Sequence, residues 1–179
     1  MPPAILWLRQ DLRTTDHPAL LAAIAEGPVI PLYILDDESP ETRAIGGAQR
    51  WWLHHSLAAL DASLRKRGSR LVLRRGAVAE IVESVAAEAG STRVHATRCY
   101  EPWWRHCEEA IDARLELRLH DGNYLAPPES ITNAQGARYR AFTPWYRALL
   151  ERMPPALPHA APDHIPPPRA WPASDNLAD

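Results

Sequence analysis

Short apolar runs alternate with stretches of helical period over the first 120 residues of the chain. An unbroken apolar run such as AILWL or VIPLYIL is typical of a strand that is buried on both faces of a sheet. Later runs are shorter and weaker, but each is bounded by glycine, proline or charged turn residues. The pattern predicts five strands, at residues 4–8, 29–35, 70–74, 93–96 and 116–120.

The stretches between these runs have the spacing of helices. Leu53, Leu57, Leu60 and Leu64 share one face of a helix expected over 48–66. A helix is expected to begin at Asp16-His17-Pro18, with Asp16 as the cap, and another to end at Gly90 after residues 78–89. A fourth follows Pro102. The alternating order predicts an α/β fold: a Rossmann-like open parallel five-stranded sheet with helices on both faces.

The composition changes after residue 125. Residues 1–125 carry the α/β pattern, and 126–152 are irregular apart from one short helix. Residues 153–179 hold eight of the 18 prolines and lack apolar periodicity. This part is predicted to be an extended, solvated interdomain linker that leads to a further domain.

Charge and composition narrow the function classes. The 179 residues carry a net charge of −2, which argues against a protein that coats nucleic acid. The apolar runs are too short to span a membrane, and no signal peptide follows Met1, so a cytoplasmic protein without membrane contact is expected. Cys99 and Cys107 are too few for a disulfide framework or a four-ligand zinc site, and we expect no metal.

Ligands of open parallel sheets bind at the carboxyl ends of the strands, which directs attention to three loops. The first, residues 9–16, has no GxGxxG and no P-loop motif. Its alternating charges Arg9, Asp11, Arg13 and Asp16 suit either an ion-pair lattice that shapes the turn or a surface that docks a domain or an anion.

The other two loops contain groups suited to a flat ligand. Asp36 follows the second strand. Its carboxylate either accepts hydrogen bonds from ribose-like hydroxyls of a ligand or only ends the strand. Arg50, Trp51 and Trp52 suit an anionic aromatic ligand, unless the tryptophans pack on the sheet.

After the fourth strand, Glu101 and Arg105 either pair with each other or orient a ligand. No nucleophile or acid–base pair is evident, so the pattern indicates a binding module.

Five segments, in order along the chain, together resemble the photolyase/cryptochrome family. They are LWLRQDLR at 6–13, PLYILD at 31–36, GAQRWWLHHSL at 47–57, Tyr100-Glu101-Pro102 with Arg105, and Tyr139 with FTPW at 142–145. The resemblance implies an N-terminal α/β domain that holds a light-harvesting antenna chromophore. In that family a following helical domain, absent from this sequence, binds FAD and repairs pyrimidine dimers in damaged DNA as a lyase.

By this resemblance, the chain is an antenna-binding domain that is inactive alone and works with an FAD-binding domain in cis, through which it meets DNA. The implied chromophore-binding residues are Ile34, Leu35, Asp36, Gln49, Arg50, Glu101 and Arg105. Trp103 and Trp104 replace the Asn-Glu pair of folate-binding members, which favours a deazaflavin or flavin over a folate. Some members carry no antenna.

Two alternatives remain open. The first is the N-terminal domain of a blue-light-signalling cryptochrome, which a repair assay on the full-length protein distinguishes from a photolyase. The second is a stand-alone nucleotide-binding α/β protein, for which the reading frame would stop near Asp179.

Overall fold

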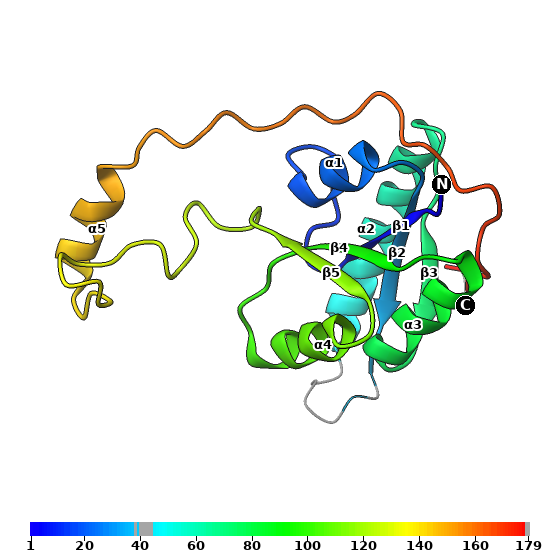
Figure 1. The fold of residues 1–179 in the computed structure, drawn as a ribbon, viewed down its shortest axis with the longest axis horizontal. Coiled ribbons are helices and arrows are strands. Elements are labelled where there is room, and N and C mark those ends of the chain that lie inside the picture. Colours follow the sequence, from blue (N-terminus) through cyan, green and yellow to red (C-terminus); the bar gives the residue numbers. More distant parts are fainter. Residues whose placement is uncertain (38, 40–44, 178–179) are drawn as a thin grey trace.

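The computed structural model describes residues 1–37, 39 and 45–177. Its centre is a five-stranded sheet in the order β3-β2-β1-β4-β5, and every neighbouring pair is parallel (Figure 1). The predicted fold class is confirmed. The strands are β1 (Ala4–Leu8), β2 (Val29–Leu35), β3 (Val72–Arg75), β4 (Arg93–Thr97) and β5 (Glu116–His120). The helices are α1 (Pro18–Ala25), α2 (Gly47–Arg65), α3 (Val78–Ala89), α4 (Pro102–Asp112) and α5 (Phe142–Leu150).

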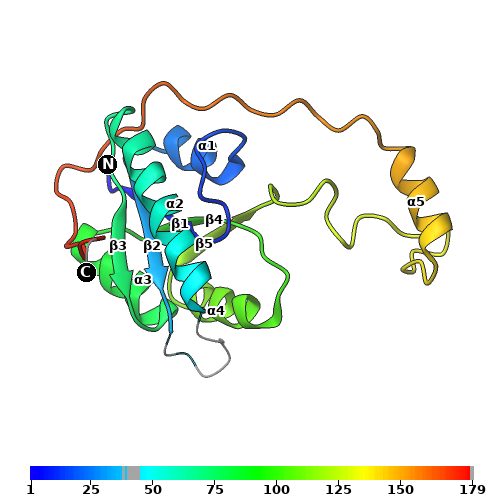
Figure 2. The ribbon, with the colours of Figure 1, turned by 180° about the vertical axis from the view of Figure 1, so that it is seen from behind.

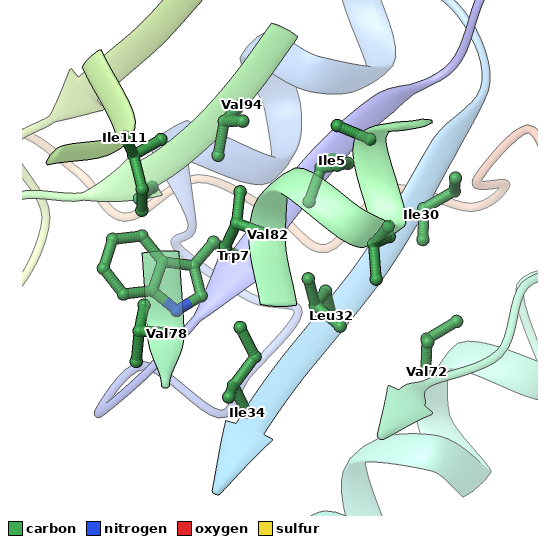
Figure 3. Packing of buried hydrophobic residues seen from close by; sticks show 13 residues of the cluster. Ile5, Trp7, Ile30, Leu32, Ile34, Val72, Val78, Val82, Val94 and Ile111 are labelled. Carbon is green, nitrogen blue, oxygen red and sulfur yellow. The ribbon is translucent and has the colours of Figure 1, made fainter. Parts of the chain in front are cut away.

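Both faces of the sheet are covered, which explains why the central strands β1 and β2 are apolar without alternation. Ile5 and Trp7 of β1 belong to a cluster with Val82 of α3 and Ile111 of α4 (Figure 3). The intervening Leu6 belongs to a second cluster, formed with α1 and α2 on the opposite face. Because successive side chains of a strand point to opposite faces, β1 supplies both cores.

The start of α1 differs from the sequence prediction. The cap is His17, whose Nδ1 accepts a hydrogen bond from the backbone N–H of Leu20 at 3.2 Å. Asp16 has a φ of 50°, in the left-handed region, and its carboxylate instead accepts the backbone N–H of His159 at 3.1 Å. Asp16 as cap was therefore wrong, because a contact distant in sequence takes its side chain.

The proline-rich end of the chain is extended, but the expectation that it is solvated is wrong for its second half. Residues 159–177, here called the strap, run along the domain (Figure 2). Ile165 is completely buried among α1, α2 and the sheet, and its N–H donates to the carbonyl oxygen of Arg67 at 2.8 Å. Trp171 lies against the Arg70 guanidinium, 4.8 Å from its ring centroid. The strap is therefore held by buried Ile165, Pro168 and Pro172 together with hydrogen bonds to backbone and side-chain groups of the domain.

Between β5 and the strap the chain leaves the domain and returns. Residues 123–158, here called the arm, carry α5 well away from the sheet, as both views show (Figures 1 and 2). No helix within the described residues has the length and apolar character that crossing a membrane requires.

Candidate functional site

A cavity of about 1290 Å³ lies at the carboxyl ends of β1 and β2. The strand order reverses beside β1, which has β2 on one side and β4 on the other, so a crevice is expected there. The first turn, the end of β2, one side of α2 and the start of α4 form its walls. The residues that line the cavity include Arg9, Tyr33, Ile34, Leu35, Asp36, Gln49, Trp52, Trp103 and Trp104.

Four of the seven sequence-predicted site residues line this cavity. They are Ile34, Leu35 and Asp36 at the end of β2 and Gln49 in the first turn of α2. The Asp36 carboxylate accepts hydrogen bonds from the backbone N–H of Ser39 at 2.9 Å and from its hydroxyl at 2.5 Å. Most of the remaining predicted loop, at 38 and 40–44, lies outside the described residues.

The other three predicted residues do not line the cavity. Arg50 Nη2 donates to Asp37 Oδ2 at 2.7 Å, and its Nε donates to the carbonyl oxygen of Ile45. Glu101 precedes α4 and accepts the backbone N–H of Tyr100 at 3.1 Å, while Arg105 is exposed on α4. A role for these three in binding a chromophore stays a prediction without support from this geometry.

Tryptophans form much of the cavity wall, which sequence reasoning only partly anticipated. Trp51 and Trp52 are adjacent and exposed, by 63% and 70%, so neither packs on the sheet. Trp52 lines the cavity, whereas Trp51 contacts the His55 ring, with centroids 4.5 Å apart. Trp103 and Trp104, which are not among the seven predicted site residues, line the cavity too. Their position directly after the fourth strand was the available signal.

Arg9 lies beneath this aromatic wall with its charge neutralised inside the protein. Its guanidinium donates to Glu108 Oε1 at 2.7 Å and to the carbonyl oxygen of Thr97. It also lies over the rings of Trp7 and Trp104, at 4.1 and 5.3 Å from their centroids. A half-buried indole is thereby held against a buried cation, which fixes the orientation of one cavity wall.

The rest of the first turn is held by internal pairs. Asp11 Oδ1 accepts the backbone N–H of Arg9 at 2.8 Å, and Oδ2 lies 3.1 Å from His17 Nε2. Burial alone would raise the pKa of Asp11, but hydrogen bonding and charge from His17 prevail and lower it to about 2. Arg13 donates to the carbonyl oxygens of Asp16 and Gly122. Arg9 and Asp11 therefore form ion pairs, whereas Arg13 and Asp16 hold the turn through hydrogen bonds to backbone groups and Asn123. These contacts agree with the interpretation in which the charges shape the turn, and docking of a domain or an anion stays a prediction.

Two titratable groups, Tyr33 in the cavity lining and Cys99 outside it, stay protonated. Burial, with a smaller contribution from the Asp37 carboxylate, raises the pKa of Tyr33 to about 12, so its hydroxyl stays protonated. Burial likewise raises the pKa of Cys99 to about 11, which keeps this thiol protonated and unreactive. Within the described residues no group of three or more His, Cys, Asp or Glu is placed to hold a metal ion.

Comparison with known proteins identifies the family. A family model for DNA photolyase matches residues 4–166. The chain belongs to the DNA photolyase family. A deoxyribodipyrimidine photo-lyase of Agrobacterium fabrum is 40% identical over 99% of this chain, and cryptochrome-1 of Arabidopsis thaliana is 32% identical over 90% of it. The chain spans 38% of the first relative and 25% of the second, and it corresponds to the N-terminal part of such longer proteins.

Solved structures agree with this photolyase assignment. The crystal structure of a bacterial class III photolyase from Agrobacterium tumefaciens has a TM-score of 0.88 at 39% identity, covering 99% of this chain and 38% of its own. An archaeal photolyase from Sulfolobus tokodaii shares the fold, with a TM-score of 0.80 at 22% identity, covering 98% of this chain and 40% of its own. That archaeal protein is described as holding two FAD molecules, with the implication of a novel light-harvesting cofactor.

Proposed function

We propose that this chain is the antenna-binding domain of a light-dependent deoxyribodipyrimidine photolyase and that the cavity at β1 and β2 holds the antenna chromophore. The observation that carries the proposal is the position of this aromatic-walled cavity at the switch point of the sheet in a member of the DNA photolyase family. Its volume of about 1290 Å³ exceeds that of typical small-molecule pockets, which leaves room for a fused ring and a polar tail.

The residues that line the cavity provide either aromatic and apolar surfaces or polar groups. Trp52, Trp103 and Trp104 offer aromatic faces to a flat ring, and Ile34 and Leu35 offer apolar contact. Asp36 and Gln49 are the polar groups placed to accept or donate hydrogen bonds to ring or tail. The chromophore, when bound, absorbs light whose energy passes by dipole coupling to FAD. The domain has only to fix the position of the ring and exclude water from it.

We favour a deazaflavin or flavin over a folate as this chromophore. Trp103 and Trp104 line the cavity at the positions where the family resemblance places the Asn-Glu pair of folate-binding members. The second FAD of the archaeal relative shows that a member of this fold accommodates a flavin besides the first. Because Arg50 and Arg105 lie outside the lining, we expect recognition of the chromophore to rest on the aromatic faces, the Asp36 carboxylate and the Gln49 amide.

Repair, and not signalling, is the activity that we propose for the complete protein. A photolyase matches 99% of this chain at 40% identity, whereas cryptochrome-1 of Arabidopsis thaliana matches 90% of it at 32%. A cryptochrome-1 of Sinapis alba is 42% identical, but only over 55% of this chain, so the proposal rests on the match over the full chain. By the family resemblance, FAD and damaged DNA are bound by a helical domain in cis, outside this chain. Family membership gives no support to the alternative of a stand-alone nucleotide-binding protein.

The chromophore proposal is tested with two neighbouring tryptophans that differ in one respect. Trp52 lines the cavity and Trp51 does not, although both are exposed on α2. In the full-length protein, we expect Trp52→Ala to weaken chromophore binding about tenfold or more, since stacking contributes about 1–3 kcal/mol. Trp51→Ala leaves binding unchanged. Binding is measured by absorbance of the purified protein, and mass spectrometry of the released chromophore distinguishes flavin, deazaflavin and folate.

A second matched pair tests the polar contacts. Gln49→Leu removes a group that lines the cavity, whereas Arg50→Ala removes the adjacent side chain that pairs with Asp37. We expect only Gln49→Leu to release chromophore. If Arg50→Ala strips the pigment while Gln49→Leu and Trp52→Ala retain it, the chromophore binds elsewhere. A full-length protein that carries no pigment besides FAD, and takes up none of the three classes, contradicts the proposal altogether.

A further inference from the structure

We propose that the outer face of α5 is an interface with the domain that follows this chain in the complete protein. This face, here called the arm face, consists of Phe142, Tyr146 and Leu150. These residues are spaced i, i+4, i+8 and so share one side of the helix. The inference depends on this chain being part of a longer protein and not on the identity of the chromophore.

The arm face is apolar and uncovered. Phe142 is 71% exposed, Tyr146 43% and Leu150 48%, although three such side chains at one place are unusual on a free surface. The rings of Phe142 and Tyr146 stack with centroids 5.4 Å apart and planes 15° apart, which makes one flat aromatic surface. Aromatic residues arranged in this way are enriched at the centres of protein interfaces.

The adjacent side of α5 is already used within the arm. Leu149 is buried, and so is Ile131 from the irregular segment before the helix. Arg152 donates to the carbonyl oxygen of Ser130 at 2.5 Å, which ties the end of the helix to the same segment. The arm therefore has a small core of its own, and the arm face is the side of the helix that this core leaves open.

Hydrogen bonds hold the chain to the α/β domain at both ends of the arm. Where the chain leaves the sheet, Arg13 donates to the carbonyl oxygen of Gly122 at 2.8 Å and to Asn123 Oδ1 at 3.1 Å. Where it returns, Asp16 and His159 exchange two hydrogen bonds, of 2.8 Å between backbone groups and 3.1 Å to the carboxylate. Both attachments come from the first turn, so the same short loop that borders the cavity also fixes the base of the arm.

The partner expected on the arm face follows from comparing the length of this chain with that of the class III photolyase. The class III photolyase structure matches 99% of this chain, arm included, with a TM-score of 0.88, yet this is only 38% of that chain. In that protein the arm therefore coexists with a much larger remainder of the same polypeptide. A covalently attached domain has a high effective concentration, which favours it over a second copy for covering a small apolar face.

The test places a photoreactive side chain in the complete protein. Replacement of Phe142 by p-benzoylphenylalanine, followed by irradiation and peptide mapping, is expected to give intramolecular crosslinks to residues beyond 179. The control is the same replacement at Leu157, which is 89% exposed in the extended part of the arm. Crosslinks between two copies, crosslinks to added DNA, or a yield at 142 no greater than that at 157 would each overturn the proposal.

A matched pair of leucines gives a second measurement. In the complete protein, Leu150→Asp is expected to speed amide hydrogen exchange in α5 about tenfold to a hundredfold, because a charge replaces an apolar side chain at the interface. Leu157→Asp leaves that exchange unchanged. Equal exchange in both variants and the parent protein contradicts the interface. Chromophore absorbance, recorded on the same samples, reports separately on the proposed antenna site.

Discussion

Arg9 shows at the scale of a residue how one buried charge organises the candidate site. Its side chain is 2% exposed and that of its partner Glu108 is 8% exposed, so water screens neither charge. The partners come from β4 and α4, and α4 also provides the Trp104 that Arg9 holds in the cavity wall. Breaking one half of such a pair costs more than removing both halves, because an uncompensated charge then stays buried.

Arg9→Met is therefore expected to reduce the free energy of unfolding by about 3–5 kcal/mol, since it leaves the Glu108 carboxylate buried without its cation. The double variant Arg9→Met/Glu108→Leu is expected to recover most of this loss. Urea unfolding followed by tryptophan fluorescence measures both variants. A double variant no more stable than the single one would show that packing, and not charge, accounts for the role of Arg9.

The strap is an element whose packing gives a proline-rich segment a structural role. β3 is an edge strand, and Leu73 on it donates to Ser174 Oγ at 3.0 Å and accepts the backbone N–H of Asp175 at 2.8 Å. The strap therefore caps an edge that would otherwise present unpaired backbone groups to other chains. Earlier in the strap, Ile165 fills the core between α1 and α2.

Ile165→Ala is expected to destabilise the domain by about 2–5 kcal/mol, as for other buried isoleucines that are truncated to alanine. Leu157→Ala, in the exposed extended part of the arm, is expected to change stability by less than about 0.5 kcal/mol. Denaturant unfolding of the two variants provides the comparison. Equal stabilities would mean that the end of the chain is a solvated linker after all.

Strands β4 and β5 bring two histidines together beside α1. His95 Nδ1 lies 3.1 Å from His120 Nε2, their rings stack, and His95 Nε2 lies 3.4 Å from Glu26 Oε2. Burial lowers the pKa of both histidines, and the Glu26 carboxylate offsets only part of this effect. Arg93 and Arg118, which pair with Glu26, also disfavour a second positive charge here.

A folded-state pKa below the usual histidine value means that the unfolded chain binds more protons at mildly acidic pH. The contribution of these two histidines to stability is therefore expected to be present above about pH 6.5 and to be lost as the pH falls below that value. Replacing both rings, as in His95→Gln/His120→Gln, should flatten this part of the profile. Chemical unfolding at a series of pH values measures it, and an equally steep profile in the double variant would assign the loss to other groups.

At the scale of the whole molecule, the chain is proposed to hold a pigment for a neighbouring domain and to perform no bond cleavage itself. The 179-residue chain, given FAD and DNA with thymine dimers, is expected to repair none under blue light, whereas the complete protein is expected to repair them. Loss of dimers is followed by chromatography of the digested DNA, with a dark sample as control. Repair by the 179-residue chain would place catalytic residues within it.

Local patterns predicted most of the secondary structure. The leucine spacing of 48–66 matches α2 to within a residue at each end, and Gly90 ends α3 with a φ of 62°. The sequence predicts the third strand at 70–74, and the structure has it at Val72–Arg75, because its short charged sequence marks no clear end. The cavity residues at the end of β2 were predictable from strand order, since carboxyl ends of parallel strands gather at one edge.

By itself, the sequence determined the type and order of the elements and the family to which the chain belongs, because hydrophobic period and motif order are properties of neighbouring residues. Tertiary structure alone decided which charges are neutralised internally and which remain available. Arg9 pairs with a residue 99 positions away, and Asp16 with one 143 positions away. Such contacts depend on how the elements pack, so no local pattern distinguishes Gln49, which lines the cavity, from Arg50, which turns away.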